Sequence, residues 1–319
     1  MSYNTTTGLL GSSNGDERNT TTGLLGSSNG DERNTNNTNN TNNTNNILCY
    51  RNYNINDDMD DKQKRKLKII SNIYKLQRLN INYDFNLYLK NKYLTFNAKT
   101  NFWTLFAALD NITDLSDPDT SLSNSIHALQ TAEAIRQTNL YPDWFALCGL
   151  IHDMGKIIYL SGNDNDGTSK MTQWSIVGDT FITGCDIPDN IIFNEFNQYN
   201  KDHKKINKYK ARCGLSKCEI SFGHDEYMYY LLKKNNHSMP QDAEYIIRYH
   251  SLYLYHSSDS YDYLLDDDDI LMKNIVKDFN QYDLYSKNDN LPIKWTYELR
   301  EYYTNLIKKY ISTYMMIYC

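Results

Sequence analysis

Apolar side chains recur through residues 47–319 mostly at the three- to four-residue spacing of amphipathic helices. Such apolar faces fall near residues 67–74, 103–109, 126–135, 144–151, 227–232, 246–254, 270–279 and 299–310. Strand patterns are few and short, one example being Trp174–Phe181. The pattern therefore predicts an all-α fold, a compact helical bundle with few short strands.

The first 46 residues lack this periodicity. Residues 4–18 recur letter for letter at 19–33, and an Asn/Thr tract fills 34–46. A short repeat with so few apolar side chains cannot bury enough surface to offset the entropy lost on ordering. We therefore expect a disordered, low-complexity tail at 1–46 and a single helical domain at 47–319.

Charge and hydropathy narrow the class of protein. The 319 residues carry 33 basic and 39 acidic side chains, a formal net charge of −6. A nucleic-acid binder needs clustered positive charge, so no nucleic-acid partner is expected. No apolar stretch approaches the ~20 residues that span a bilayer, and no signal peptide is apparent. We expect a soluble cytoplasmic protein without a membrane partner, whose six cysteines, none in a C-x-x-C pair, stay reduced.

Two charged segments permit two interpretations each. Lys201–Arg212 holds six basic residues in twelve, which could contact an anionic partner but is more simply a solvated loop. Asp266–Asp269 could hint at calcium, yet its spacing is not that of an EF-hand loop. Acidic residues at the start of a helix, where the macrodipole favours them, explain this run more simply.

Candidate metal ligands interrupt the apolar helices. His152 and Asp153 lie in the apolar run WFALCGLIHDMGK, where two buried polar residues would be costly without partners. Other such residues amid apolar periodicity are His127, His224, His250 and Asp283. Four imidazoles and two carboxylates contributed by five helical segments would make a dinuclear metal centre, in which a carboxylate next to a histidine can bridge two metals.

The donor atoms limit which metal such a centre would hold. Nitrogen and oxygen donors without sulfur suit iron or manganese, and zinc is not excluded. The chain has no Glu-x-x-His pair of the ferritin-like type, and no H-E-x-x-H, G-x-S-x-G, P-loop or G-x-G-x-x-G motif. The remaining histidines, His203, His237 and His256, lie in polar or loop-like settings, and we expect them at the surface.

Longer words in the sequence carry a family resemblance. His127, His152-Asp153 and Asp283 look like the H…HD…D signature of HD-domain metalloproteins. The chain also contains, in order, DPD, HALQTAEAIR, HDMGK, VGDTF, CGL, GHDEY, IRYHS and FNQYDLYSK. Across about 47–310 these words resemble the myo-inositol oxygenase family. The resemblance implies an HD-type helical fold that holds two iron ions per chain. It also implies an enzyme that converts myo-inositol and O₂ into D-glucuronate and water.

The resemblance also implies roles for individual residues. For one iron it implies the ligands His127, His152, Asp153 and Asp283. For the other it implies His224 and His250, with the Asp153 carboxylate shared between the two ions. Near the substrate it implies Arg51, Asp114, Leu115, Ser116, Lys156, Gly178, Asp179, His250, Ser251 and Lys287. Among these, Lys156 is the expected catalytic group, because a cation lowers the pKa of a nearby coordinated hydroxyl.

Three departures from the family pattern accompany the resemblance. Residues 161–172 are longer than the usual connection, which could alter a rim of the site. Leu115 stands where an acidic residue is common, so only a backbone contact is expected there. The ending TYMMIYC differs from the family's, which puts lid contacts from that end in doubt.

Two other functions remain open at this stage, and we expect a monomer in each case. An HD-domain phosphohydrolase would use the same His-His-Asp-Asp core, with Arg or Lys side chains converging on a phosphate. A binding module with a decayed metal site is the other possibility, although every apparent ligand is intact. Among the words above, GHDEY and DLYSK favour the oxygenase.

Overall fold

The computed structural model describes residues 59–118, 122–286 and 293–319. The chain divides into two units, 1–45 and 46–319, and only the second contains described residues. The predicted disorder of residues 1–46 therefore lies outside the described part and stays a prediction. All described helices and strands belong to the second unit.

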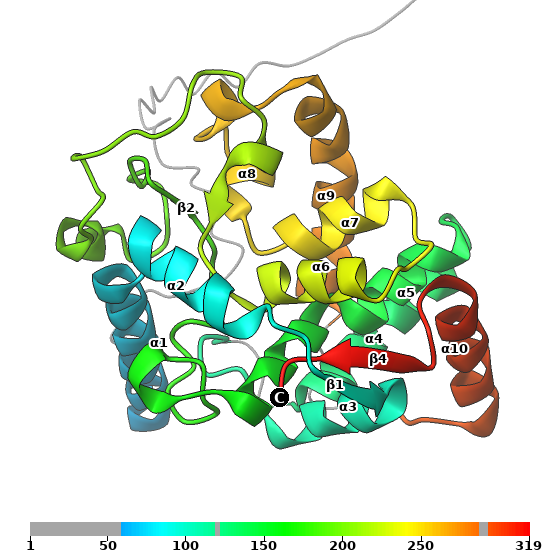
Figure 1. The fold of residues 1–319 in the computed structure, drawn as a ribbon. Coiled ribbons are helices and arrows are strands. Elements are labelled where there is room, and N and C mark those ends of the chain that lie inside the picture. The colour runs from blue at the N-terminus through cyan, green and yellow to red at the C-terminus, as the bar shows by residue number, and fades with distance from the viewer. Residues whose placement is uncertain (1–58, 119–121, 287–292) are drawn as a thin grey trace, which may run out of the picture. The chain divides into compact units, whose positions relative to one another are not determined.

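Helices make up most of this unit, which confirms the all-α prediction (Figure 1). The α-helices are α1 (Asp61–Asn80), α2 (Tyr83–Tyr93), α3 (Phe102–Ala108), α4 (Asn124–Thr138), α5 (Asp143–Ile151), α6 (His224–Lys234), α7 (Gln241–Tyr249), α8 (Tyr253–His256), α9 (Asp267–Tyr285) and α10 (Tyr297–Tyr310). Short 3₁₀ helices cover Leu109–Asn111, His152–Ser161, Asp164–Asp166, Asn194–Tyr199, Leu215–Lys217 and Asp262–Leu264.

The four described strands form two antiparallel pairs. β1 (Ala98–Asn101) pairs with β4 (Tyr314–Ile317), with Ala98 opposite Ile317, so the end of the chain lies beside the segment that leads into α3 (Figure 1). β2 (Ile182–Thr183) pairs with β3 (Glu219–Ile220). The last residues of the chain thus form one strand of a two-stranded sheet.

Local sequence signals set where helices begin. The side chain of Asp266 accepts a hydrogen bond from the Asp269 N–H, while the Asp269 side chain accepts one from the Asp266 N–H. This reciprocal pair caps α9. The acidic run 266–269 is therefore a helix start, as predicted.

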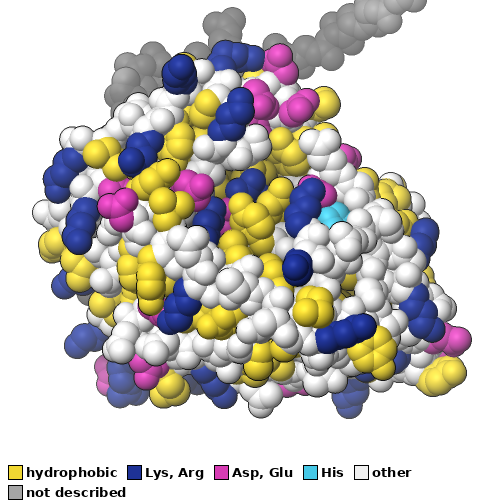
Figure 2. Space-filling view, viewed as in Figure 1, with side chains coloured by type: hydrophobic (Ala, Val, Ile, Leu, Met, Phe, Trp, Pro, Cys, Tyr) yellow, Lys and Arg dark blue, Asp and Glu magenta, His cyan; other side chains and the backbone are white. Residues whose placement is uncertain are grey.

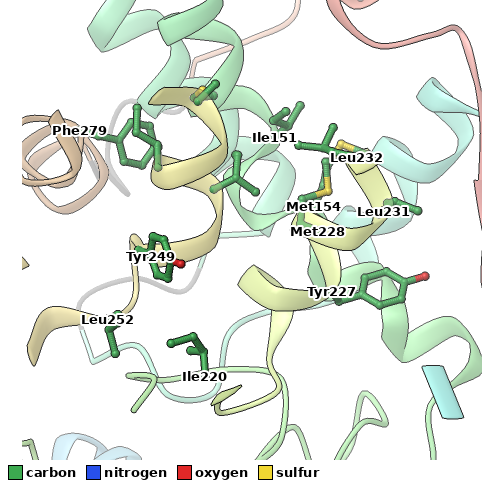
Figure 3. Packing of buried hydrophobic residues seen from close by; sticks show 14 of the residues in the cluster. Ile151, Met154, Ile220, Tyr227, Met228, Leu231, Leu232, Tyr249, Leu252 and Phe279 are labelled. Atoms are coloured by element: carbon green, nitrogen blue, oxygen red, sulfur yellow. The ribbon is translucent and has the colours of Figure 1, made fainter. Parts of the chain in front are cut away.

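The core between α5, α6 and α7 explains how the candidate ligands come together. Ile151, Met154 and Leu232 belong to one buried cluster with Phe279 of α9 (Figure 3). The backbone at Gly155 passes so close to the start of α6 that an added Cβ would lie 1.9 Å from the His224 carbonyl oxygen. Glycine here lets the segment carrying His152 and Asp153 contact the segment carrying His224.

Replacing Gly155 by alanine is expected to lower the free energy of unfolding by about 1–3 kcal/mol, because backbone must move to admit the methyl group. Urea unfolding checks this. Gly223→Ala is the matched control, since its nearest neighbour would lie 3.7 Å away and its backbone is extended. Equal stability of both variants would contradict the close approach at Gly155.

Two predicted elements are wrong. Trp174–Phe181 contains no strand, because its backbone turns repeatedly and Gly178 has a φ of +85°. The apolar side chains there are nevertheless buried in the hydrophobic core. The predicted helix through Leu254 ends at Tyr249, and a turn at 250–252 separates it from α8.

The surface agrees with the modest net charge. In the view of Figure 2, basic, acidic and hydrophobic side chains are interspersed. Among the described helices, none is both long and apolar enough to cross a membrane.

Candidate metal centre

Five elements bring the six candidate ligands together, and all six are buried. The sequence predicted that His152 and Asp153 lie in the middle of a helix. They are instead the first two residues of the 3₁₀ helix that follows α5. The others come from α4, from the first residue of α6, from the residue after α7 and from the end of α9, as His127, His224, His250 and Asp283.

One group of donors surrounds Asp283. Its Oδ1 lies 2.8 Å from Nε2 of His127 and 3.4 Å from Nε2 of His152. Oδ2 of Asp153 lies 3.8 Å and 3.6 Å from the same two nitrogens. Two imidazole nitrogens and two carboxylate oxygens thus face a common space.

A second group lies on the other side of Asp153. Oδ1 of Asp153 is 3.2 Å from Nε2 of His224, which is itself 3.2 Å from Nε2 of His250. The two oxygens of this carboxylate therefore face different groups of imidazoles. A carboxylate that bridges two metal ions needs this arrangement.

Backbone carbonyls fix the tautomers of three of the histidines. The Nδ1 atoms of His152, His224 and His250 lie 2.9, 2.6 and 3.1 Å from the carbonyl oxygens of Gly149, Ile176 and Ile247. A carbonyl oxygen can only accept, so each Nδ1 donates its proton to a carbonyl. When the ring is neutral, this leaves Nε2 as an electron-pair donor. Histidines that bind metals are oriented in this way.

Both carboxylates are anionic at neutral pH. Burial alone would raise the pKa of Asp153, but Lys156 and the neighbouring imidazoles outweigh burial and hold this pKa well below its usual value. Burial of Asp283 is likewise outweighed by His152 and His127, which keep its pKa low. The centre thus combines negative charge with imidazole donors, which suits a cation.

Asp225 is a buried residue of this centre to which the sequence analysis gave no role. Its Oδ1 lies 2.9 Å from Nε2 of His224 and has no hydrogen-bond partner among the described residues. Its Oδ2 accepts a hydrogen bond from the Ser251 N–H at 3.2 Å. His224, Asp225 and His250 form one group able to hold a metal. The signal was the His-Asp pair in GHDEY, which repeats the His152-Asp153 pair.

An open cavity adjoins these donors, and five of the six candidate ligands line it. Lys156 lies in its wall and donates to Asp114 Oδ2 at 2.8 Å, Asn124 Oδ1 at 3.0 Å and Asp153 Oδ2 at 2.8 Å. Burial alone would lower the pKa of Lys156, but Asp114 and Asp153 outweigh burial and raise it. Lys156 is therefore a charged ammonium. The sequence analysis gave Asn124 no role. The structure places it in the cavity wall, in contact with Lys156.

The predicted substrate contacts from the described chain lie at or beside this cavity. Asp114 lines the cavity and accepts hydrogen bonds from the N–H and Oγ–H of Ser116 at 2.8 and 2.6 Å. Gly178 and Asp179 also line it, and Oδ1 of Asp179 accepts from the Tyr74 hydroxyl at 3.0 Å. The segment 177–179 is therefore held against α1.

Ser251 lines the cavity next to His250, with its Oγ 3.4 Å from Nε2 of His224. Arg51 and Lys287 lie outside the described residues. Their predicted substrate contacts stay predictions.

None of residues 161–172, the connection expected to be longer than usual, lines the cavity. Asp166 within this connection accepts hydrogen bonds from Lys92 at 2.7 Å and from the Tyr93 hydroxyl at 2.8 Å. Just beyond it, Gln173 accepts a hydrogen bond from the N–H of Leu115 at 3.2 Å. At Leu115 we expected a substrate contact through the backbone alone. The backbone N–H of Leu115 already donates to Gln173 within the protein.

The surface position predicted for His256 is wrong. Its side chain is buried, and its Nε2 lies 3.0 Å from the carbonyl oxygen of His250. Burial lowers the pKa of His256 to about 3, so the ring is neutral. The residues next to His256 in the sequence, among them Ser257, are polar, so the sequence gave no sign that its side chain is buried.

Comparisons with known proteins point to one family. The sequence model of the family described as "Myo-inositol oxygenase" matches residues 67–317. A protein of Sus scrofa named "Inositol oxygenase" is 42% identical over 209 residues, 63% of this chain and 71% of that protein. Proteins with the same name from Danio rerio and Dictyostelium discoideum are each 37% identical, over 82% of this chain and 90% and 87% of their own lengths.

Proposed function

The chain belongs to the myo-inositol oxygenase family and is an oxygenase, and from this premise we propose that it cleaves the ring of myo-inositol with O₂ at a centre of two iron ions. The products would be D-glucuronate and water. The observation that carries the two-metal proposal is the Asp153 carboxylate, whose oxygens face two separate groups of imidazoles.

The residues present fit a pair of metal ions. Nε2 of His224 and Nε2 of His250 are 3.2 Å apart, and each is an electron-pair donor because its Nδ1 proton is engaged. Two lone pairs facing each other beside an anionic carboxylate repel unless a proton or a metal ion lies between them. Nitrogen and oxygen donors without sulfur suit iron or manganese.

We assign the ligands as the family resemblance implies. One ion would take His127, His152, Asp153 and Asp283. The other would take His224, His250 and the shared Asp153. When bound, two irons would supply the one-electron steps that no amino-acid side chain can perform.

The cavity wall suits a neutral polyol. The ionised carboxylates of Asp114 and Asp179 offer only acceptors, which match hydroxyl donors. The ammonium of Lys156 would stabilise a deprotonated hydroxyl, since a nearby cation favours the anion. Ser251 would add a hydroxyl beside His250, and Arg51 and Lys287 are proposed as further contacts.

The phosphohydrolase alternative has less support. Such an enzyme needs several cations that converge on a phosphate. Among the described residues that line the cavity, Lys156 is the one cation.

We further propose that residues 47–319 form the whole catalytic domain and act as a monomer in the cytoplasm. A chain starting at residue 47 keeps the proposed contact Arg51, so its turnover is expected to match that of the full chain. Turnover by the two chains at equal iron content checks this. A loss of activity on truncation would give residues 1–46 a role.

O₂ uptake by the iron-loaded protein with myo-inositol, with glucuronate measured in the same sample, tests the proposed reaction. One glucuronate per O₂ is expected. Absence of uptake by protein holding two irons would refute the reaction, and hydrolysis of phosphate esters would then be measured instead.

A further inference from the structure

The turn at residues 250–252 ends α7 and carries two residues of the proposed site. His250 is the residue after the helix, and Ser251 follows it in the cavity wall. The last carbonyls of a helix have no partner within the helix, so a buried helix end needs donors from elsewhere. At this turn the donors come from two other helices.

The carbonyl oxygen of His250 accepts two side-chain hydrogen bonds. His256, the last residue of α8, donates from Nε2 at 3.0 Å, and Asn280 of α9 donates from Nδ2 at 2.7 Å. Both side chains are buried, with exposed fractions of 2% and 4%. Both donors to this carbonyl are therefore held inside the protein.

The protonation of His256 suits this contact. The Ser257 hydroxyl lies 2.9 Å from its Nδ1 and serves as a donor to it. The neutral ring then carries its proton on Nε2, directed at the His250 carbonyl.

Asn280 also joins two of the proposed metal positions. It lies three residues before Asp283 on α9, so both side chains project from one face of that helix. Its amide therefore connects the helix that carries Asp283 to the turn that carries His250. A shift of the turn would move Nε2 of His250 away from Nε2 of His224, 3.2 Å away.

We propose that His256 and Asn280 are positioning residues for the second metal ion, because their hydrogen bonds to the His250 carbonyl hold that ligand opposite His224. This inference rests on the proposed two-metal centre. Neither residue touches the metal or the substrate in it. Both act through the backbone of a ligand.

The test is anaerobic calorimetric titration of the full-length metal-free chain with Fe(II), comparing His256→Phe with His256→Gln. Phenylalanine keeps the ring and removes the donor, whereas glutamine keeps an N–H at similar reach. Substitution of residues behind a metal ligand typically weakens binding 10–100-fold. We expect His256→Phe to weaken one of the two ions at least about 10-fold and to leave the other unchanged, while His256→Gln stays within about 3-fold of the parent.

Asn280→Leu removes the second donor at similar volume and is expected to weaken the same ion; it carries the test if His256→Phe does not fold. Equal weakening of both ions, or a lower melting temperature of the metal-free variants with unchanged Fe(II) affinities, would overturn the positioning role. If the parent chain itself binds fewer than two ions, the two-metal centre fails, and the inference fails with it.

Discussion

Asp153→Asn is expected to leave the chain with at most one tightly bound iron and to reduce turnover by more than about 100-fold, beyond the cost of substituting a residue behind a ligand. An asparagine side chain keeps one acceptor oxygen but replaces the other by an NH₂ donor and removes the negative charge. It can therefore face His127 or His224 with an oxygen, but not both. Iron per chain and O₂ uptake measured on the same preparation check this.

The matched control for this variant is Asp166→Asn. Asp166 is also a buried aspartate, but it bonds to Lys92 and Tyr93 away from the metal donors. The Asp166→Asn protein should retain two irons per chain, even if the substitution changes the free energy of unfolding. An Asp153→Asn protein that still holds two irons would refute the bridging assignment.

The helices could be predicted from the sequence because amphipathic periodicity reports burial of one face. The same signal failed where burial had another cause. Trp174–Phe181 is apolar because its side chains belong to the hydrophobic core, although its backbone turns at Gly178 instead of extending as a strand. The periodicity of α7 continues to Leu254, so it could not reveal the break after Tyr249.

The six proposed ligands could be named in advance because histidine and aspartate are conspicuous within apolar helices. The residues that orient them could not. Asn124 and Asn280 are ordinary amides in the sequence, and their contacts to Lys156 and to the His250 carbonyl arise only when separate helices pack. His256 was misjudged for the same reason, since its partner is a backbone carbonyl that any residue would provide.

Lys156→Met is expected to lower turnover by at least about 100-fold when compared with the parent at two irons per chain, with iron content and turnover measured on the same preparation. Methionine has nearly the shape of lysine without its charge, so the variant removes the cation that would stabilise a deprotonated substrate hydroxyl. Lys92→Met, which breaks the ion pair with Asp166 away from the cavity, is the control and should turn over normally. A Lys156→Met enzyme with unchanged kcat would refute the catalytic role.

The same substitution predicts a pH-dependent loss of stability in the metal-free protein. Burial alone would raise the pKa of Asp114 and of Asp153, and Lys156 is the first group that offsets burial and lowers both. A carboxylate with a lowered pKa stabilises the fold above its unfolded pKa, and this contribution is lost as pH falls. Removing one partner of a buried ion pair costs about 3–5 kcal/mol. Urea unfolding at pH 7 should therefore show a free energy of unfolding lower than the parent's by this amount. The difference should shrink below pH 4, because protonated carboxyl groups no longer need the cation. An equal difference at both pH values would contradict this electrostatic account.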